Sequence, residues 1–579
     1  MNETRQSALR RANDPEFVDR YFSGIGLDIG TGSDFQSDLA SHFPAIQQLV
    51  GWDIERRDPV HMDGAPADVF DFVHSRCLGH LANPRQAIAR WLELVKPGGY
   101  LILTVPNGER GEGGMPPTGF DANHKHGFTM YEPDAAMQDS VNVLDLVIDA
   151  LPIASCERTC LIHEHDHDPH SPLDDLQHEA AQCTIEIVLC KRHVPPLSDV
   201  IDAIETAENE SVLSQNCREA LRLYPYRFET YFRVSLAVLR WGHSHELEAV
   251  WAACIQRLPN ERLPRLFHAL GLIALGKLNE GFRLREALWV GVDWSGRTTA
   301  RPPDYAEWRG EPLRGKSIVI WSEFGLGDEI FFFRFARILR THYGAARVTV
   351  VCQAPLVELF KASGEAAAIY AVEEAQSLPP HDYWVYPHAI PAWAALDIDH
   401  LPEAVPYLRA TGNSAPTVVP RSQRALKVGV VFKGAPTHEN DSARSLPSLG
   451  CLDPLFELEG VEFYIMQKGQ GEAEAAEYSA RLDHVHDLGP CLRSFGDTAN
   501  VLEALDLLIS VDTSAANLAG AMGKPVWLML PMYGDWRWHF DRDDSPWYPS
   551  ARLFRESGVG WPEVVARMRH ALIGLRDNR

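Results

Sequence analysis

Three kinds of feature are missing from this 579-residue chain, and each absence narrows the class of protein. No apolar run reaches the roughly 20 residues that a membrane-spanning helix needs, and the first residues, MNETRQSALRRANDPEF, are polar. The ten cysteines include no Cys-x-x-Cys pair, so neither a zinc finger nor a disulfide framework is indicated. Lys and Arg number 54 against 79 Asp and Glu, and the net charge of −25 argues against a nucleic-acid partner. We therefore expect a cytoplasmic protein with reduced thiols, no membrane span and no nucleic-acid partner.

The domain organisation follows from the length and from the alternation of strand-like and helix-like stretches. The chain is too long for one hydrophobic core, so about three domains are expected. Strand-like and helix-like runs alternate over 1–195, the pattern is helical over 196–300, and alternation returns over 301–579. The last region is expected to form two halves, about 301–415 and 416–579. The predicted fold class is α/β multidomain with a helical middle.

The first domain opens with a strand that runs into a glycine turn. GIGLDIGTGSD (24–34) places Gly30 and Gly32 where the backbone can approach a ligand closely. About twenty residues later, Asp53 ends a second strand, in the position that takes ribose hydroxyls in doubly wound folds. Further elements are expected in this order: a strand at 70–75, a helix at 84–95, a strand at 98–107, and an edge strand at 184–192 that closes the sheet.

This ordered set resembles the class I S-adenosylmethionine-dependent methyltransferases over about residues 24–107. LDIGTG, WDIE, MDGA, FDFVHSRCLGHLANP and VKPGG follow one another as in that family, and His80 matches its histidine after the fourth strand. The resemblance implies a Rossmann-like fold and an S-adenosylmethionine site. The implied contacts are Asp28, Gly30 and Gly32 to the methionine moiety, Asp53 to the ribose, and Asp63 with Gly64 to the adenine edge. Asp34 stands where the pattern has its third glycine, so a degenerate scaffold domain is the alternative.

Two stretches rich in histidine carry weaker hypotheses. TGFDANHKHGFTMYEP (118–133) has the character of a lid, with His124, Lys125 and His126 as acceptor contacts, and solvated loop side chains as the alternative. Between Glu157 and Leu173, His163, His165, His167 and His170 lie among Asp and Pro. No finger or helical spacing fixes a metal geometry there, so a solvated loop is the interpretation and no metal site is predicted.

The middle region has the period of a helical repeat. CREALRLYP and AACIQRLPN place Pro225 and Pro259 34 residues apart, each after a helix with Ala and Leu on one face. This is the tetratricopeptide period, with two helices per repeat, and FHALGLIALGKLNEGFRLREALW (267–289) would be a third unit. So few repeats are expected to pack against a neighbouring domain. Binding of a peptide and a structural spacer are equally good interpretations.

The C-terminal region is organised around Leu507–Tyr548. Leu507–Val511 is apolar throughout and predicts a buried parallel strand, after which Asp512, Thr513 and Ser514 are suited to begin a helix. A strand-to-helix turn at the carboxyl end of a parallel sheet offers free N–H groups and a helix dipole to an anion. The stretch therefore predicts a cradle for a phosphorylated ligand.

These residues resemble the GT-B glycosyltransferases, and most of all the bacterial proteins in which tetratricopeptide repeats precede a heptosyltransferase-like or O-GlcNAc-transferase-like region. The resemblance covers nearly all of 305–556 and consists of EFGLGDEI, FKGAPTHENDSARSLP, MQKG, SVDT and DWRW in that order. It implies two doubly wound halves, a nucleotide-sugar donor and an inverting, metal-independent reaction. Asn517 stands where the family has His, and Lys433 where it has a small residue.

The donor's diphosphate needs cationic or N–H stabilisation in place of a metal. The candidates for donor binding are Lys468, Arg444, Lys433, Asp512, Thr513, Ser514 and Asn517, with Trp536 and Trp538 as faces for the nucleotide base. The acceptor needs a base near the anomeric carbon. The resemblance implies Asp328 for this role, with His438 as the competing choice and a simple helix cap as the alternative role for Asp328.

The predicted function is transfer of a sugar from a nucleotide-sugar to a protein or glycan acceptor, with the helical repeats favouring a protein. In one reading the first domain also methylates the sugar or its carrier with S-adenosylmethionine, and in a second it is a recognition module. A third reading is a non-catalytic binding protein that uses the repeats, with Asp34 and Asn517 marking two decayed sites.

Overall fold

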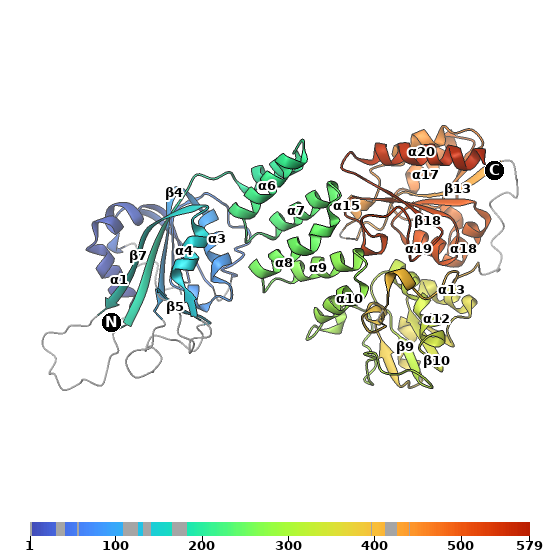
Figure 1. Cartoon of the computed structure of the whole chain (residues 1–579), viewed down its shortest axis with the longest axis horizontal. Coiled ribbons are helices and arrows are strands. Elements are labelled where there is room, and N and C mark those ends of the chain that lie inside the picture. The colour runs from blue at the N-terminus through green and yellow to red at the C-terminus, as the bar shows by residue number, and fades with distance from the viewer. Residues whose placement is uncertain are drawn as a thin grey trace. The chain divides into compact units, whose positions relative to one another are not determined.

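The computed structural model of the chain describes residues 3–30, 41–54, 57–107, 125–130, 140–164, 182–394, 396–410, 425–438 and 440–578 (Figure 1). Two compact units result: Met1–Val234 with Ala253–Glu261, and Ser235–Ala252 with Arg262–Arg579. Within the described ranges, no helix combines the length and the apolar character that crossing a membrane requires. The nine cysteines whose side chains the structure describes are free thiols. The chain is mixed α/β with several parallel sheets, as the sequence predicts.

The first unit is built on a six-stranded sheet. Its order is β2-β1-β3-β4-β8-β7, with the first four strands parallel and the last two antiparallel. The strands are β1 (Gly24–Ile29), β2 (Ile46–Trp52), β3 (Phe70–Ser75), β4 (Val95–Pro106), β7 (Ala154–Glu164) and β8 (Gln182–Lys191). The prediction that 184–192 forms the edge was wrong: β8 lies inside the sheet and β7 is the edge strand. β7 was missed because alternating Cys, Arg and His residues hide a strand in a stretch that reads as polar.

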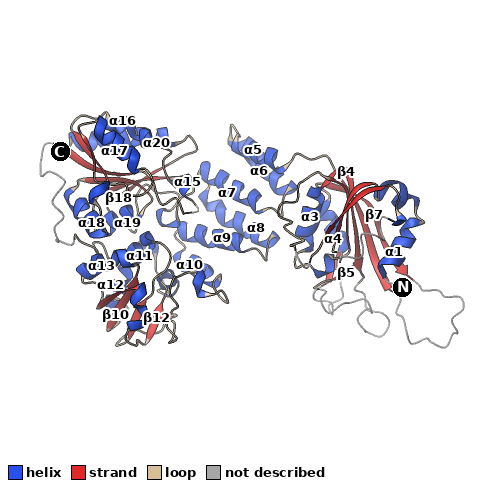
Figure 2. Cartoon of the chain, turned by 180° about the vertical axis from the view of Figure 1, so that it is seen from behind, coloured by secondary structure: helices blue, strands red, loops and turns tan. Residues whose placement is uncertain are grey.

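Helices cover both faces of this sheet. α1 (Glu3–Ala12) lies on one face and α3 (Pro84–Leu94) and α4 (Val143–Ala150) on the other (Figures 1 and 2). α3 begins where Asn83 accepts a hydrogen bond from the Gln86 N–H and Pro84 occupies the first turn. α1 is fixed by Arg11, whose buried guanidinium donates to Glu186 at 2.7 Å and to Thr104 at 2.6 Å. A buried cation of this kind is tolerated because it is paired with the Glu186 carboxylate and lies over the Phe17 and Phe22 rings.

Six helices follow the first sheet. They are α5 (Leu197–Glu205), α6 (Glu210–Leu223), α7 (Phe228–Arg240), α8 (Leu247–Arg257), α9 (Arg262–Ala274) and α10 (Leu278–Ala287). α6 and α8 end two residues before Pro225 and Pro259, so the 34-residue period does correspond to two helices. The helices do not form a compact unit of their own, because the boundary between the two units crosses α7 and α8. The structure thus establishes helix pairs, and membership of the tetratricopeptide family stays a prediction.

The second unit holds two fully parallel sheets. The smaller has the order β11-β10-β9-β12 and the larger β15-β14-β13-β16-β17-β18. Their strands are β9 (Ser317–Ile320), β10 (Arg347–Cys352), β11 (Ala368–Ala371), β12 (Tyr383–Val385), β13 (Leu426–Val431), β14 (Val461–Ile465), β15 (Val485–Asp487), β16 (Leu507–Val511), β17 (Val526–Leu530) and β18 (Ala551–Arg555). Each sheet starts at a central strand, adds strands on one side and then reverses. The strand order therefore switches between β9 and β12 and between β13 and β16, where ligands bind in doubly wound folds.

Helices on both faces complete each of these sheets. In the larger one, α17 (Glu472–Arg481) and α20 (Trp561–Asp577) cover one face and α18 (Phe495–Ala504) and α19 (Ser514–Ala521) the other (Figures 1 and 2). The smaller sheet carries α11 (Leu326–Phe332), α12 (Arg334–Thr341) and α13 (Val357–Ser363). The sequence predicts one amphipathic helix over IFFFRFARIL where α11 and α12 form two, because no proline or glycine marks the break at Phe333.

Replacing two glycines in the helices that cover the larger sheet should change stability in opposite directions. A Cβ on Gly520 of α19 would lie 2.5 Å from the buried Tyr548 ring, whereas one on Gly574 of α20 would meet nothing within 4 Å. We expect Gly520→Ala to lower the unfolding free energy of the second unit by about 1–3 kcal/mol through overpacking. Gly574→Ala should raise it by roughly 0.5–1 kcal/mol, since alanine favours the helix. Urea denaturation followed by tryptophan fluorescence checks both, and equal shifts for the pair would contradict the packing of α19 on Tyr548.

Candidate functional site

The turn after β9 brings Asp328 to the switch point of the smaller sheet. α11 begins at Leu326 with Gly325 as its N-cap, and Asp328, three residues after Gly325, accepts the Gly325 N–H at 3.0 Å through Oδ2. The capping role predicted as an alternative is therefore present. The cap uses only Oδ2, so the other carboxylate oxygen, Oδ1, is available for a different partner.

That second oxygen, Oδ1, joins the two halves of the unit. It accepts a hydrogen bond from Arg537, which lies after β17 in the larger sheet and also donates to Asp535 at 2.8 Å. His388, in the turn after β12, places Nε2 at 3.6 Å from the same oxygen. Burial acts to raise the pKa of Asp328, but the Arg537 guanidinium and His388 together hold it well below its usual range. Asp328 is thus ionised and ion-paired.

A fully buried carboxylate, Glu323, orients His388. Glu323 accepts the imidazole Nδ1 at 2.9 Å and the His388 backbone N–H at 3.1 Å, and it pairs with Arg297 at 2.6 Å. Burial disfavours the charge, yet His388 and Arg297 lower the pKa of Glu323. Because Glu323 fixes Nδ1, the other ring nitrogen, Nε2, faces Asp328. Glu323 therefore sets the orientation of the imidazole ring.

The larger sheet supplies a second carboxylate, Asp512, directly after β16. Burial and the nearby Asp535 raise the pKa of Asp512 to about 6, against the opposing effect of Arg537. Asp512 precedes the start of α19, where Thr513 accepts the Ala516 N–H at 3.4 Å. The helix begins with Ser514, as the sequence predicts. Gly327 of α11 lies against this start, because a Cβ there would be 3.7 Å from the Ser514 Cα and 3.5 Å from the Asn517 amide nitrogen.

The predicted cationic donor contacts lie after β13 and β14, and each has a protein partner. Lys468 donates to the Gly489 carbonyl at 3.1 Å and approaches Glu472 at 3.4 Å, with half of its side chain exposed. Lys433 pairs with Glu474 at 3.0 Å. Arg444 lies over Gly434, where a Cβ would be 2.7 Å from its guanidinium, and its Nε is buried without a hydrogen-bond partner among the described residues. Arg444 Nε also lies 3.6 Å from the Asp441 carboxylate, so all three cations are ion-paired, and Arg444 is the one whose buried Nε has no hydrogen bond.

Three other predicted contacts have surroundings that were not expected. Asn517 is 4% exposed and its amide is used inside the protein, donating to the Thr513 carbonyl at 3.1 Å and accepting from Tyr548 at 3.1 Å. Trp536 is 6% exposed, with Phe282 and Phe331 edge-on to its ring. Neither it nor the wholly buried Trp538 offers an open face to a nucleotide base. His438 is exposed in the loop after β13, where its Nδ1 accepts the Asn440 N–H at 3.1 Å.

Glu323, His388 and Arg537 were missed from the sequence. Each nevertheless stands directly after a strand or in a quoted motif: Glu323 opens EFGLGDEI, Arg537 lies within DWRW, and His388 follows β12 in YWVYPHAIP. A charged residue at the carboxyl end of a buried parallel strand is the signal that was available. The pairing of Asp328 with Arg537 could not be inferred from the sequence, because the two residues are 209 positions apart.

In the first unit, the predicted cofactor residues divide between core and surface. Asp28 is 1% exposed and accepts His74 Nδ1 at 2.8 Å from the neighbouring strand, while its Oδ2 is buried without a partner among the described residues. Gly30 has φ +96°, and a Cβ there would lie 2.7 Å from the Cys77 Cβ. Asp53 is half-buried at the end of β2, and Asp63 with Gly64 is exposed. Gly32, Asp34, His124, His165, His167 and His170, with the His163 side chain, lie outside the described residues.

These placements fit an S-adenosylmethionine site in part. The turn after β1 is tight, as a close backbone approach to a ligand requires, and Asp53 stands at the adjacent strand end. The Asp28 carboxylate faces the core rather than the cleft, which leaves its Oδ2 as an unused acceptor. Of the predicted lid, Lys125 and His126 are described: their N–H groups lie 2.8 and 3.3 Å from the Gly79 carbonyl, next to His80.

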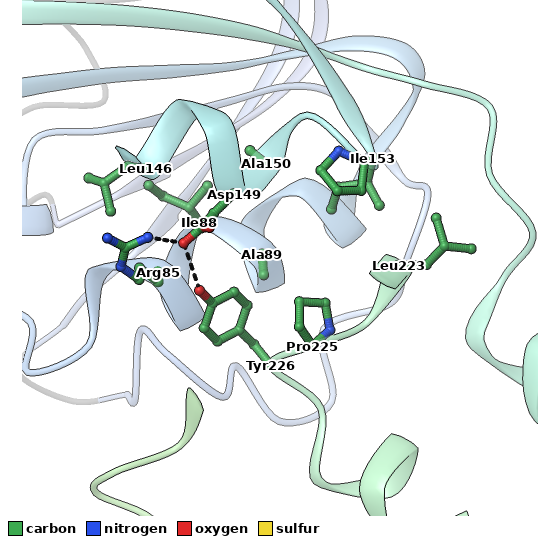
Figure 3. A pocket seen from close by; sticks show the side chains of 11 residues that line it. Arg85, Ile88, Ala89, Leu146, Asp149, Ala150, Ile153, Leu223, Pro225 and Tyr226 are labelled. Atoms are coloured by element: carbon green, nitrogen blue, oxygen red, sulfur yellow. Dashed lines mark hydrogen bonds and ion pairs between the residues drawn. The ribbon is translucent and has the colours of Figure 1, made fainter. Parts of the chain in front are cut away.

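A small cavity lies elsewhere in the first unit. Figure 3 shows it between α3, α4 and the turn after α6, where Arg85, Asp149 and Tyr226 point toward one another. Asp149 accepts from both Arg85 and the Tyr226 hydroxyl, the latter at 3.0 Å. The cavity holds about 20 Å³, room for about one water molecule. It is lined by none of the predicted site residues, so it is a packing defect of the unit and offers no ligand site.

Comparison with known proteins gives two results of different scope. Residues 1–136 match a family model described as a methyltransferase domain. The curated protein FlbA of Caulobacter vibrioides is 27% identical over 385 residues, which span 61% of this chain and 63% of FlbA. The chain therefore matches less than two thirds of the length of this relative.

Solved structures with a detectable likeness include two glycosyltransferases. The glycosyl transferase family 9 protein of Veillonella parvula is 12% identical, at a TM-score of 0.33, over 46% of this chain and all of that one. The ADP-heptose lipopolysaccharide heptosyltransferase II of E. coli is 12% identical, at a TM-score of 0.32, over 45% of this chain and 99% of that one.

The raised pKa of Asp512 predicts how stability depends on pH. The folded state holds this proton more tightly than the unfolded state, so stability falls as the pH rises from about 4 to about 6 and the cost persists above that range. Asp512→Asn removes the cost. We expect it to raise the unfolding free energy of the second unit at about pH 7.5 by on the order of 1–2 kcal/mol, with the difference closing near pH 4.

The measurement is the urea midpoint of both proteins at several pH values. Asp483→Asn, at an exposed position of the same sheet's surface, is the matched control and should track the wild type throughout. A constant difference at every pH would mean that Asp512 is not a buried carboxylate with a raised pKa.

Proposed function

We propose that the second unit is a glycosyltransferase that moves a sugar from a nucleotide-sugar donor to a protein or glycan acceptor. The observation that carries the proposal is the cluster of Asp328, His388 and Arg537, in which the switch point of the smaller sheet is joined to the segment after β17 of the larger sheet. Such points bind phosphorylated ligands in doubly wound folds. The motif resemblance over 305–556 supplies the reaction class, inverting and independent of a metal.

In this proposal the larger sheet binds the donor. N–H groups at the start of α19, beside Thr513 and Ser514, donate hydrogen bonds to the diphosphate, and Arg444 and Lys468 neutralise the charge that develops as it leaves. Both cations have a protein carboxylate nearby, Arg444 with Asp441 at 3.6 Å and Lys468 with Glu472 at 3.4 Å, and Arg444 is the one whose buried Nε has no hydrogen bond among the described residues. Asp512, with its pKa near 6, would be protonated more readily still when a diphosphate arrives.

The smaller sheet supplies the base. Asp328 takes the proton from the acceptor hydroxyl or amide, the new bond forms to the anomeric carbon, and the bond from that carbon to the diphosphate breaks with its electron pair. Because Arg537 holds Asp328 in an ion pair, the carboxylate is ionised and ready to accept a proton only when Arg537 shifts toward another anion. His438 remains the competing base, exposed in its loop.

We further propose that the first unit binds S-adenosylmethionine and methylates the transferred sugar or its carrier. The support is the match of residues 1–136 to a methyltransferase domain, together with the turn after β1 and Asp53 after β2. The cofactor would supply an electrophilic methyl group; Asp53 would hold its ribose and Gly30 would let the backbone approach it. Asp63 and Gly64 are the remaining candidates, whereas the Asp28 carboxylate faces the core.

The donor is identified by a thermal-shift panel of UDP, ADP and GDP on the full chain. A nucleotide that binds the folded state raises the melting temperature by mass action, and one of the three should do so. Lys468→Ala should reduce the shift. Lys361→Ala is the matched control, because Lys361 is equally exposed and equally paired with a neighbouring glutamate, and it should leave the shift unchanged.

Asp328→Asn separates binding from chemistry in the same experiment. It should keep the nucleotide shift and lower transfer by at least about a hundredfold, as loss of a general base does. If none of the three nucleotides at millimolar concentration raises the melting temperature of the wild type, the interpretation as a non-catalytic binding protein is favoured.

S-adenosylhomocysteine tests the first unit separately. We expect a melting shift of the transition of that unit, abolished in Asp53→Ala because the ribose contact is lost. Asp145→Ala, at an exposed position in the first turn of α4, is the control and should respond as the wild type does. A shift that survives in Asp53→Ala would remove Asp53 from the site, and no shift at all would leave the first unit as a recognition module.

A further inference from the structure

A turn in the second unit, between α7 and α8, carries two histidines and a glutamate close together. Of the described residues, His243, His245 and Glu246 form the one group of three in which imidazole nitrogens and a carboxylate oxygen all lie within 4.8 Å of one another. His245 and Glu246 are exposed and His243 is half-buried, so an ion from solvent can reach them. The sequence drew attention to the histidines at 163–170, and this turn was missed because its spacing, His-x-His-Glu, matches no finger or helical metal pattern.

Backbone hydrogen bonds fix the positions of the three residues. α7 ends in a Schellman motif, in which the His243 N–H donates to the Val238 carbonyl at 2.7 Å across Gly242, whose φ is +77°. The Glu246 N–H then donates to the His243 carbonyl at 2.9 Å and closes a 3₁₀ turn over Ser244–Glu246. Residues three apart are eclipsed in such a turn, so His243 and Glu246 lie on the same side of it. The three side chains are therefore held near one another by the fold itself, which lowers the entropy that an ion would have to overcome.

Ser244, between the two histidines, connects the turn to a second segment of the same unit. It is 5% exposed, and its hydroxyl donates to the Asp541 carboxylate. Two positions before Asp541, the Nδ1 atom of His539 lies 2.7 Å from the carbonyl of Ala274 at the end of α9. Ser244 is thus the inner residue of the turn, and the more exposed residues on either side of it are the ones that could hold an ion.

We infer that His243, His245 and Glu246 bind a Zn²⁺ ion, with water completing its coordination. Two imidazoles and one carboxylate suit zinc, whereas Mg²⁺ and Ca²⁺ take oxygen ligands. A tetrahedral ion with ligands at about 2.0–2.1 Å holds the ligand atoms roughly 3.3–3.4 Å apart. The distances in the turn, up to 4.8 Å, close to these values by rotation of the side chains, and the hydrogen-bonded backbone need not move.

The role of the ion is structural. None of its three ligands belongs to the residues proposed for the donor or the acceptor, so the transfer proposed above still needs no metal. His243 follows the end of α7 and Glu246 directly precedes α8, so the ion links the two helix ends. Because the ligands come together in the folded turn and not in the unfolded chain, the ion stabilises the second unit by mass action.

The test uses the full chain without an affinity tag, first stripped with a chelator and then dialysed against micromolar ZnCl₂. The wild type should retain about one equivalent of zinc more than His245→Ala, because the variant lacks one of the three protein ligands. Zinc should also raise the melting temperature of the second unit by a few degrees in the wild type and not in His245→Ala. MgCl₂ at the same concentration should do neither, because it does not favour imidazole ligands.

Two further variants separate loss of a ligand from other effects. His165→Ala combined with His167→Ala removes a histidine pair of the same spacing from the 163–170 stretch, and it should keep the equivalent of zinc. Glu246→Gln should weaken zinc binding by at least about tenfold, since a neutral amide replaces an anionic ligand. Without metal, His245→Ala and Glu246→Gln should melt with the stripped wild type, because both positions are exposed.

Equal zinc content in the wild type and His245→Ala would overturn the site. Loss of the equivalent in the His165 and His167 double variant, with His245→Ala unaffected, would assign the zinc to the other histidines and overturn it as well. So would binding that needs millimolar zinc in every variant, which is adventitious binding to surface histidines only. None of these outcomes involves a nucleotide, so the donor panel and the zinc measurements succeed or fail independently.

Discussion

The hydrogen-bonded ion pair between Asp328 and Arg537 is the interaction on which the second unit depends. It joins the turn after β9, at the switch point of the smaller sheet, to the segment after β17 of the larger sheet, so two separate sheets meet at one pair of charges. Glu323 and Arg297 extend it on one side through His388, and Asp535 and Asp512 on the other. Asp328, Glu323 and Arg537 each have an opposite charge and a hydrogen-bonding neighbour, which is the condition for burying a charge, whereas the like charge of Asp535 raises the pKa of Asp512. Removal of one member would leave its partner as an uncompensated buried charge.

The same condition holds the first unit together in a different way. Arg11 of α1 links the Glu186 carboxylate, the Thr104 hydroxyl and His74 across three strands of the sheet, and His74 passes the contact on to Asp28. A residue predicted to face a cofactor is thereby part of a polar core. In both units, buried charged residues determine which helices and turns pack against each other. The apolar strands determine only that a sheet forms.

Local sequence accounts for the elements and for half of the site. The strand Leu507–Val511, the cap at Thr513 and the turn before Asp328 follow from apolar runs and capping residues, whose effects reach only a few positions along the chain. The order of β7 and β8, the inward orientation of Trp536 and the pairing of Asp328 with Arg537 follow from contacts between distant segments, which no single stretch encodes. Asn517 shows the difference well: the motif placed it at the right helix, and only packing against Tyr548 shows that its amide is already used.

Gly327 carries a consequence for how this sequence can change over evolutionary time. Its missing side chain is where α11 meets the start of α19, with the Ser514 Cα 3.7 Å and the Asn517 amide 3.5 Å from the position of a Cβ. Alanine would fill that distance as an ordinary contact, and anything larger would push the two helix starts apart. A substitution at position 327 in one half is therefore tolerated only with particular residues at the start of α19 in the other half. Descendants of this chain should keep positions 327 and 517 in matched pairs, even though each belongs to a different sheet.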